Sequence, residues 1–179
     1  MTNLDSLRYP IGPFTIPDHF SEEIIEDWIQ QIATLPTRLR KEVEQLNDTQ
    51  LDSPYRPEGW TIRQVVNHLA DSHMNALLRF KLTLTEDNPV IKPYSEQLWA
   101  ELVDSKTMPI TPALSIVEGV HTRLVALLNA MSEEDFERSY IHPQYQREYK
   151  LKEVLALYAW HGNHHLAHIT SIKQTMGWA

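Results

Sequence analysis

Apolar residues recur at helical spacing in four long stretches of this chain. The first stretch, residues 21–46, keeps that spacing through Pro36, which we expect to kink the helix or divide it in two. The second, residues 61–85, opens with Thr61 and Gln64 in the positions of a capping box, in which each side chain bonds the backbone N–H of the other residue. Both stretches are therefore predicted to be long amphipathic helices.

The other two stretches lie in the second half of the chain. Thr111 is predicted to be the N-cap of a helix with Pro112 in its first turn, and apolar residues continue from there at helical spacing to Met131. The last stretch covers about residues 152–176, and Gly177 is placed to end it. With four long helices and no run of strands, the pattern predicts an all-α fold, a four-helix bundle.

The connections between these helices differ in length and kind. Residues 86–110 form a long crossover loop between the second and third helices, with three prolines and one short helical stretch at residues 95–102. A connection of this length is usually functional, and we expect its Tyr94 and Trp99 to line a pocket. Residues 139–151, before the last helix, alternate β-prone residues around a turn signal and predict a small hairpin.

Residues 1–14 contain Pro10, Gly12 and Pro13, and they are predicted to form an extended arm lying on a single domain of residues 1–179. The length of 179 residues, 42% of them hydrophobic, suits one core. The chain begins without a cationic and apolar signal sequence, and its longest apolar run, residues 154–160, is far shorter than the about 20 residues of a membrane helix. We therefore expect a cytoplasmic protein with no membrane partner.

Charge and cysteine content narrow the chemistry further. The chain has 16 Lys+Arg against 24 Asp+Glu, a net charge of -8, so it offers no basic surface for a phosphate backbone. Nucleic acid is therefore not expected as a partner. Because the chain has no cysteine, a bound metal would have to be held by imidazole, carboxylate or water.

Four of the nine histidines lie within eight positions of the last predicted helix: His161, His164, His165 and His168. At about 100° per residue, His161 and His165 fall within about 20° of the direction of the core, whereas His168 lies about 40° and His164 about 80° away from it. We therefore expect His161 and His165 to point inward, and His164 to face solvent or a neighbouring helix.

The spacing of His161 and His165 lets two imidazoles converge on one metal ion, whereas His161 and His168 lie about 10.5 Å apart along the axis, which is too far. The plain alternative is a set of hydrogen-bonded core histidines. Several buried imidazoles would then need partners, at about 1 to 3 kcal/mol for each nitrogen left without one. A metal site is thus the favoured interpretation.

A catalytic metal commonly takes three protein ligands, so a third must come from another helix. His68 and His73 in the second helix and His121 in the third are the candidates. Helical periodicity favours His73, which lies close to the core face, and puts His68 at the edge of that face. The residues alone leave the choice open.

The motifs GWTIRQVVNHLADSHMN, WHGNHHLAHI and YPIG together resemble the DinB superfamily, and within it the YfiT-like metal-dependent hydrolases, over essentially the whole chain. The hallmark of the superfamily is a histidine before Leu-Ala in the second helix and an HxxxH pair in the last. These correspond here to His68, His161 and His165. The resemblance therefore implies that these three histidines bind one zinc or nickel ion per chain at one mouth of the bundle, in a protein that is often a homodimer.

Three neutral imidazoles leave a divalent ion its full charge, which lowers the pKa of a bound water and favours hydrolysis of a small-molecule substrate. Gly162 follows His161 where a zincin has its glutamate, so a peptidase of that type is not expected. Asp71, three residues after His68, is the candidate catalytic base or orienting residue, although a surface aspartate is equally consistent with its place.

Two other functions stay open. The same tri-histidine centre could activate a small thiol, as in the thiol-dependent S-transferases of the bacillithiol type among DinB relatives. The other is a non-catalytic metal-binding or ligand-binding bundle, for which a closed coordination shell would be the sign. A di-iron carboxylate centre needs two ExxH motifs, and Glu118 with His121 supplies only one.

Overall fold

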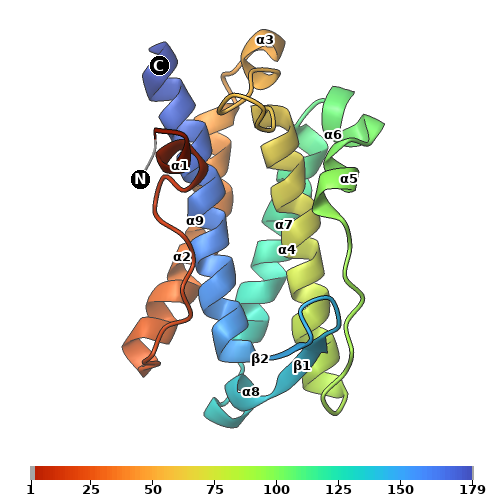
Figure 1. Ribbon diagram of the computed structural model, residues 1–179. Coiled ribbons are helices and arrows are strands. Elements are labelled where there is room, and N and C mark those ends of the chain that lie inside the picture. The colour runs from red at the N-terminus through yellow and green to blue at the C-terminus, as the bar shows by residue number, and fades with distance from the viewer. Residues whose placement is uncertain (1–2, 179) are drawn as a thin grey trace.

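Four long helices form a bundle in the computed structural model, which describes residues 3–178 (Figure 1). They are α2 (Glu22–Val43), α4 (Ile62–Thr85), α7 (Thr111–Leu128) and α9 (Leu151–Met176). Helix α2 packs against α7 and α9, and α4 packs against the same two helices. The predicted four-helix bundle is confirmed. Within residues 3–178, no helix is both long enough and apolar enough to cross a membrane.

The predicted signals at two helix ends are present. The Thr61 hydroxyl accepts a hydrogen bond from the Gln64 backbone N–H at 3.2 Å, and Gln64 Oε1 accepts one from the Thr61 backbone N–H at 2.9 Å. These bonds satisfy two N–H groups that the first turn of a helix leaves without partners. Gly177 ends α9 in the left-handed conformation, with φ of 65°, which glycine adopts without steric cost.

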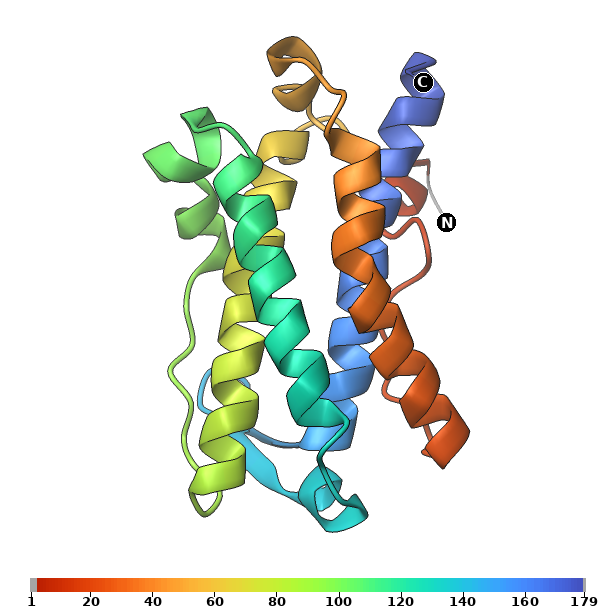
Figure 2. The same cartoon turned by 180° about the vertical axis from the view of Figure 1, so that it is seen from behind.

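Two proline positions differ from the simplest expectation. Helix α7 already includes Thr111, so Ile110 is its N-cap and Pro112 is the second helical residue. Proline suits this place as well, because no N–H in the first turn has a partner within the helix. Helix α2 is not divided at Pro36. It remains one element, and Figure 2 shows it bending along its length.

A layer of histidines crosses the middle of the bundle and separates two apolar clusters. Each long helix contributes to both clusters. In α4 the clusters are separated by the segment between Ala70 and Ala76, and in α7 by the segment between Val117 and Leu124. In α9 the clusters are separated by residues 160–165. Buried histidine rings fill these gaps: His73, His121, His164 and His165, with the partly exposed His161 beside them. The helices thus present polar side chains at one common level.

The long crossover loop lies along α4. It contains two short helices, α5 (Glu96–Ala100) and α6 (Val103–Thr107), where the sequence pattern predicted one stretch, and both pack against α4. The predicted hairpin is confirmed as strands β1 (Ser139–His142) and β2 (Arg147–Lys150), which pair antiparallel with Ser139 opposite Lys150. Helix α8 (Glu133–Glu137) precedes it. Helices of five residues are too short to leave a periodic signal.

The N-terminal arm is only partly extended. Residues Asn3–Arg8 form a short helix, α1, so the prediction of an extended arm over residues 1–14 is wrong for this part, while Met1 and Thr2 lie outside the described residues. The prolines that motivated the prediction begin only at Pro10. A proline restricts the residue directly before it, here Tyr9, so the residues before Tyr9 can form a helix. The arm lies against α9, where the Trp160 indole N–H donates to the Gly12 carbonyl at 3.2 Å.

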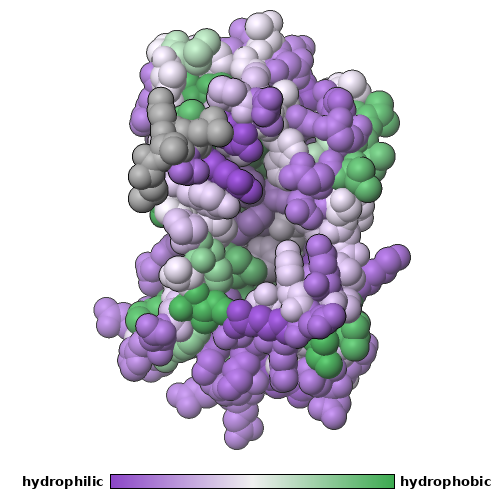
Figure 3. Space-filling view, in the orientation of Figure 1, coloured by the Kyte–Doolittle hydropathy of each residue, from purple (hydrophilic) through white to green (hydrophobic). Residues whose placement is uncertain are grey.

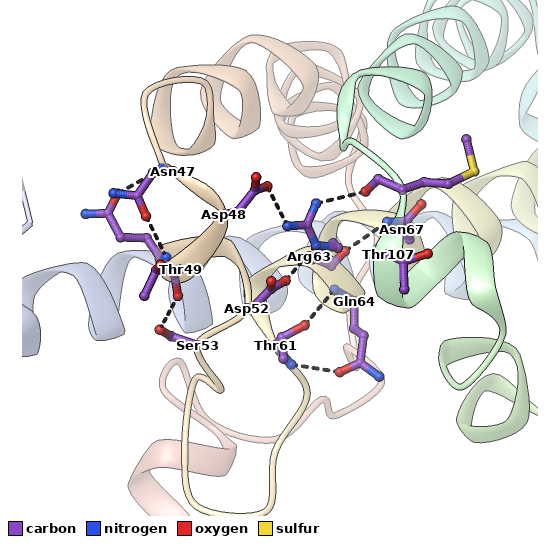
Figure 4. A network of polar contacts seen from close by, with 12 residues as sticks. Asn47, Asp48, Thr49, Asp52, Ser53, Thr61, Arg63, Gln64, Asn67 and Thr107 are labelled. Carbon is purple, nitrogen blue, oxygen red and sulfur yellow. Dashed lines mark hydrogen bonds and ion pairs between the residues drawn. The ribbon is translucent and has the colours of Figure 1, made fainter.

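Arg63 ties α4 to two neighbouring segments (Figure 4). Its side chain is almost fully buried, with 3% exposed. It donates hydrogen bonds to Asp48 in α3 (Asp48–Leu51), to Asp52, and to the carbonyl oxygen of Met108 in the crossover loop, at 2.7 to 2.8 Å. Arg63 therefore holds the loop and α3 against the start of the helix that carries His68.

Substituting Arg63→Met is expected to lower the free energy of unfolding by about 1 to 3 kcal/mol, because the Met108 carbonyl loses its donor. Loss of the ion pairs with Asp48 and Asp52 should add little to this destabilisation, since both carboxylates are largely exposed and can be hydrated. Urea denaturation would measure the change. The metal content per chain should stay the same, since Arg63 offers no ligand, and an unchanged urea midpoint would contradict the assigned role.

Candidate metal centre

Three histidines from two helices converge on one point beside the histidine layer. His68 comes from α4, and His161 and His165 come from successive turns of α9; one ring nitrogen of each lies within 4.8 Å of the others. The Nε2 atoms of His68 and His161 are 3.1 Å apart, and the rings of His161 and His165 have centroids 4.6 Å apart. The HxxxH spacing therefore places two imidazoles together, as expected from the helical geometry.

Close packing of α9 on α2 holds this part of the centre in place. A Cβ atom added to Gly162 would come within 2.5 Å of Leu35 Cδ2, so the Leu35 side chain would have to shift to admit a larger residue. Sequence reasoning treated Gly162 merely as the absence of a catalytic glutamate. Because Gly162 directly follows His161 and has no side chain, Leu35 of α2 packs against α9 beside this candidate ligand.

The donor set fits a divalent metal ion. Nitrogen ligands about 2.0 to 2.1 Å from a tetrahedral ion lie about 3.3 to 3.4 Å from one another, close to the separation of the two Nε2 atoms. No described residue offers a hydrogen bond to the buried His165 Nδ1, so this nitrogen lacks the partner that an ordinary core histidine would have. Three imidazoles without a thiolate suit zinc and nickel among other divalent ions.

Burial keeps these histidines neutral. Burial, together with a smaller effect of His168, lowers the pKa of His68 to about 4. Burial also lowers the pKa values of His161 and His165 well below the ordinary value, and neighbouring imidazoles add to the effect. A neutral imidazole keeps a lone pair on one nitrogen, which is the form that binds a metal.

A chain of hydrogen bonds runs from His161 to the backbone of α2. His161 Nδ1 lies 3.2 Å from His73 Nε2, His73 Nδ1 lies 2.9 Å from His121 Nε2, and His121 Nδ1 lies 2.6 Å from the carbonyl oxygen of Ile32. Burial lowers the pKa values of His73 and His121, so both rings are neutral. Each ring therefore carries one proton, and the chain crosses the bundle from α9 through α4 and α7 to α2.

The Ile32 carbonyl determines which nitrogen carries each proton. A carbonyl oxygen only accepts, so His121 must donate from Nδ1 and accept at Nε2. His73 then donates from Nδ1 and accepts at Nε2, which makes His161 the donor at Nδ1. The lone pair of His161 is thereby left on Nε2, the atom that faces His68. We call this set of three rings, His73, His121 and His161, the histidine relay.

The structure places the three candidates for the third ligand differently from what helical periodicity predicted. His68, which periodicity put at the edge of the core face, lies against His161 Nε2, with its ring 4.7 Å from that of Trp60. Both ring nitrogens of His73 and of His121 are used within the histidine relay. Periodicity identified His73 as buried but carried no information about the ring opposite it.

The prediction that His164 faces solvent or a neighbouring helix is wrong. Its ring is buried, 4.4 Å from the stacked ring of Trp160 and 5.9 Å from that of Tyr9. The N-terminal arm supplies Tyr9, so a segment more than 150 residues away covers this face of α9. His168 is also buried, stacked on Tyr55 with centroids 3.9 Å apart, and its Nε2 lies 3.1 Å from the carbonyl oxygen of Arg8.

His164, His165 and His168 form a second group in which one nitrogen of each lies within 4.8 Å of the others. The double change His164→Ala and His168→Ala is nevertheless expected to leave one ion per chain, because His68 and His161 remain on their helices. Metal analysis of the folded variant would test this. A metal-free double variant beside a His161→Ala variant that keeps its ion would instead place the site at His164, His165 and His168.

The metal centre opens into a cavity of about 570 Å³. Figure 3 shows the hollow in the middle of this face, with hydrophilic residues in it. All three candidate ligands line the cavity, and Arg79, Tyr94, Tyr140 and His142 line it as well. Of these four residues, only Tyr94 was predicted from the sequence to line a pocket. The available signal for Arg79 was its place on the same face of α4 as His68.

Asp71 does not line this cavity. It lies on α4 next to the buried Ser72, and burial raises its pKa to about 6, with Asp104 adding to the effect. Its role as a catalytic base stays a prediction, and its position argues against direct proton transfer at the metal centre. Trp99 is outside the cavity lining as well, where it packs on Tyr94 with ring centroids 4.5 Å apart.

The chain belongs to the DinB superfamily, whose family model matches residues 31–169. It is 51% identical over 175 residues to a protein of Bacillus cereus (strain 03BB102), and the alignment covers 98% of this chain and 100% of that one. A protein of Bacillus thuringiensis subsp. konkukian (strain 97-27) matches to the same extent. Both are named "Putative metal-dependent hydrolase". The resemblance drawn from the sequence motifs is confirmed.

A solved structure shares the whole fold. YfiT from Bacillus subtilis, described as "a probable metal-dependent hydrolase with an unusual four-helix bundle topology", is 46% identical and superposes with a TM-score of 0.95. The match covers 97% of this chain and 99% of that one.

Proposed function

We propose that this protein is a metal-dependent hydrolase in which His68, His161 and His165 hold one divalent ion that activates water against a small-molecule substrate. The observation that carries the proposal is the convergence of three neutral imidazoles at one end of a cavity. The names of the relatives support the same class of activity. A cavity of about 570 Å³ is within the range of small-molecule sites, about 300 to 1,000 Å³.

The protein residues have separate tasks in this proposal. A bound divalent ion would supply a Lewis acid and lower the pKa of water towards neutrality. The histidine relay holds His161 with its lone pair on Nε2, and the ring of Trp60 packs on His68 and restricts its orientation. Three protein ligands leave further coordination positions available, as in catalytic rather than structural zinc sites.

We further propose zinc or nickel as the ion, a homodimeric assembly and a cytoplasmic location. The donor set of three imidazoles supports the choice of ion, and family resemblance supports the assembly. Metal analysis of protein purified without added metal would identify the ion, and light scattering would give the mass in solution. A monomeric mass or a different native metal would overturn the corresponding part.

An activity screen tests the hydrolase proposal. Metal-loaded protein and chelator-treated protein would be assayed on esters, amides and electrophiles, each with and without low-molecular-mass thiols. We expect metal-dependent release of an acid without any thiol, and loss of this activity in His161→Ala. Arg63→Met is the matched control, because it changes a buried side chain that offers no ligand and does not line the cavity. Turnover that occurs only with a thiol would show that the protein is an S-transferase and not a hydrolase.

A further inference from the structure

Arg79 occupies the end of the cavity away from the three candidate ligands. It follows His68 by eleven residues on α4, which places it within about 20° of the same helix face and about 16 Å further along the axis. Its side chain lines the cavity and donates a hydrogen bond from Nη1 to the Tyr158 hydroxyl at 3.2 Å. Tyr158 precedes His161 by about one turn of α9, so this bond links Arg79 to the helix that carries two of the candidate ligands.

Arg79 has no carboxylate partner among the residues that the structure describes. Among residues 3–178, no carboxylate lies within 4.0 Å of it, although the chain has 24 Asp and Glu residues. On the same helix, Arg63 pairs with two aspartates. Arg38 also lacks a carboxylate, but its guanidinium has two oxygen acceptors, Asn163 Oδ1 and the Gln31 carbonyl. A guanidinium has five N–H donors, and the acceptors found for Arg79 among residues 3–178 are the neutral hydroxyls of Tyr158 and Tyr140.

Neutral hydrogen-bonding groups surround this cation. Tyr94 from the crossover loop, Tyr140 and His142 from β1, and Tyr158 from α9 line the same end of the cavity. Burial raises the pKa of Tyr94 to about 12 and also raises that of Tyr140, so both phenols keep their protons. His142 Nδ1 is buried without a partner. The carboxylates that line the cavity, Glu58, Glu96 and Glu101, are all exposed at its rim.

We propose that Arg79 binds an anionic group of the substrate, a carboxylate, while the bond to be cleaved lies at the metal end of the cavity. This inference rests on the proposed hydrolase function and narrows its substrate to a small ester or amide that also carries a carboxylate. A partly buried cation without a counter-ion is costly unless a ligand supplies the charge. The planar guanidinium matches a carboxylate with two parallel hydrogen bonds, and the neighbouring phenols can donate to the same oxygens.

Binding of dicarboxylates to the metal-loaded protein tests the proposal without turnover. The probes are succinate, glutarate and adipate, each compared with its monomethyl ester, which keeps one carboxylate for the metal and loses the other. We expect at least one diacid to bind roughly tenfold or more tightly than its monoester in titration calorimetry. Arg79→Met should remove this preference, and Arg79→Lys should keep part of it, because lysine retains the charge but not the fork of donors.

Arg56→Met is the matched control at the other end of the cavity, where Arg56 Nη1 already donates to the Pro57 carbonyl at 2.9 Å. It should leave the preference for the diacid unchanged. Equal binding of diacids and monoesters by the original protein, or a preference lost in Arg56→Met and kept in Arg79→Met, would overturn the proposal. If Arg79→Met does not fold by circular dichroism, Arg79→Gln gives the same comparison with a shorter polar side chain.

The two proposals can fail separately. The diacid and its monoester are compared by binding alone, so the result does not depend on whether any ester is hydrolysed. A protein that prefers the diacid through Arg79 but hydrolyses nothing would count against the hydrolase function only. A protein that hydrolyses neutral esters and ignores the second carboxylate would count against the role of Arg79 only.

Discussion

Replacing any one of His68, His161 and His165 by alanine is expected to abolish binding of the divalent ion while the protein stays folded. Each substitution removes one of three converging ligands, and the remaining two imidazoles cannot hold a divalent ion against dilution and washing. Metal analysis after gel filtration would measure occupancy, and circular dichroism would measure helix content. Occupancy should fall from one ion per chain to nearly none in all three variants.

His142→Ala is the matched control for these substitutions. His142 is another buried histidine that lines the same cavity, but it comes from β1 and lies outside both groups of converging histidines. We expect it to keep its ion. Full occupancy in any one of the three ligand variants would remove that residue from the site, and loss of metal from His142→Ala would show that the cavity rather than the three ligands controls retention.

Replacing His73 by alanine is expected to keep the metal site but weaken its affinity by about 10- to 100-fold, the effect typical of partners that orient a ligand. The change breaks the histidine relay, so His161 is no longer forced to carry its proton on Nδ1. It also leaves His121 Nε2 without its donor, at a cost of about 1 to 3 kcal/mol in the free energy of unfolding. Competition with a metal-binding dye would give the affinity.

Two further measurements separate orientation of the ligand from general loss of stability. Leu124→Ala removes a fully buried side chain one turn beyond His121 and should lower stability without changing metal affinity. Nitrogen NMR of labelled histidine should show the His161 proton on Nδ1 in the original protein and a mixture of tautomers in His73→Ala. A folded His73→Ala protein that binds no metal at saturating concentration would make His73 a ligand, as helical periodicity alone suggested.

The long elements of this fold could be predicted from the sequence because their signals are local. A helix of 18 to 26 residues repeats its apolar face several times, and the capping box of Thr61 and Gln64 and the terminal Gly177 lie within a few residues of the ends that they define. Helix α1 was missed because three nearby breakers, Pro10, Gly12 and Pro13, dominated a segment whose first residues contain none.

Local geometry likewise brought His161 and His165 together, because four residues separate neighbours on one helix face. The partners of the other histidines depend on segments far away in sequence. His164 is covered by Tyr9, His168 bonds the Arg8 carbonyl, and His121 bonds the Ile32 carbonyl. Periodicity gives the direction of a side chain from its own helix axis, whereas burial and hydrogen bonding depend on what lies opposite. That is why the sequence could predict a histidine-rich bundle, and only the packing of α2, α4, α7 and α9 separated the converging ligands from the relay behind them.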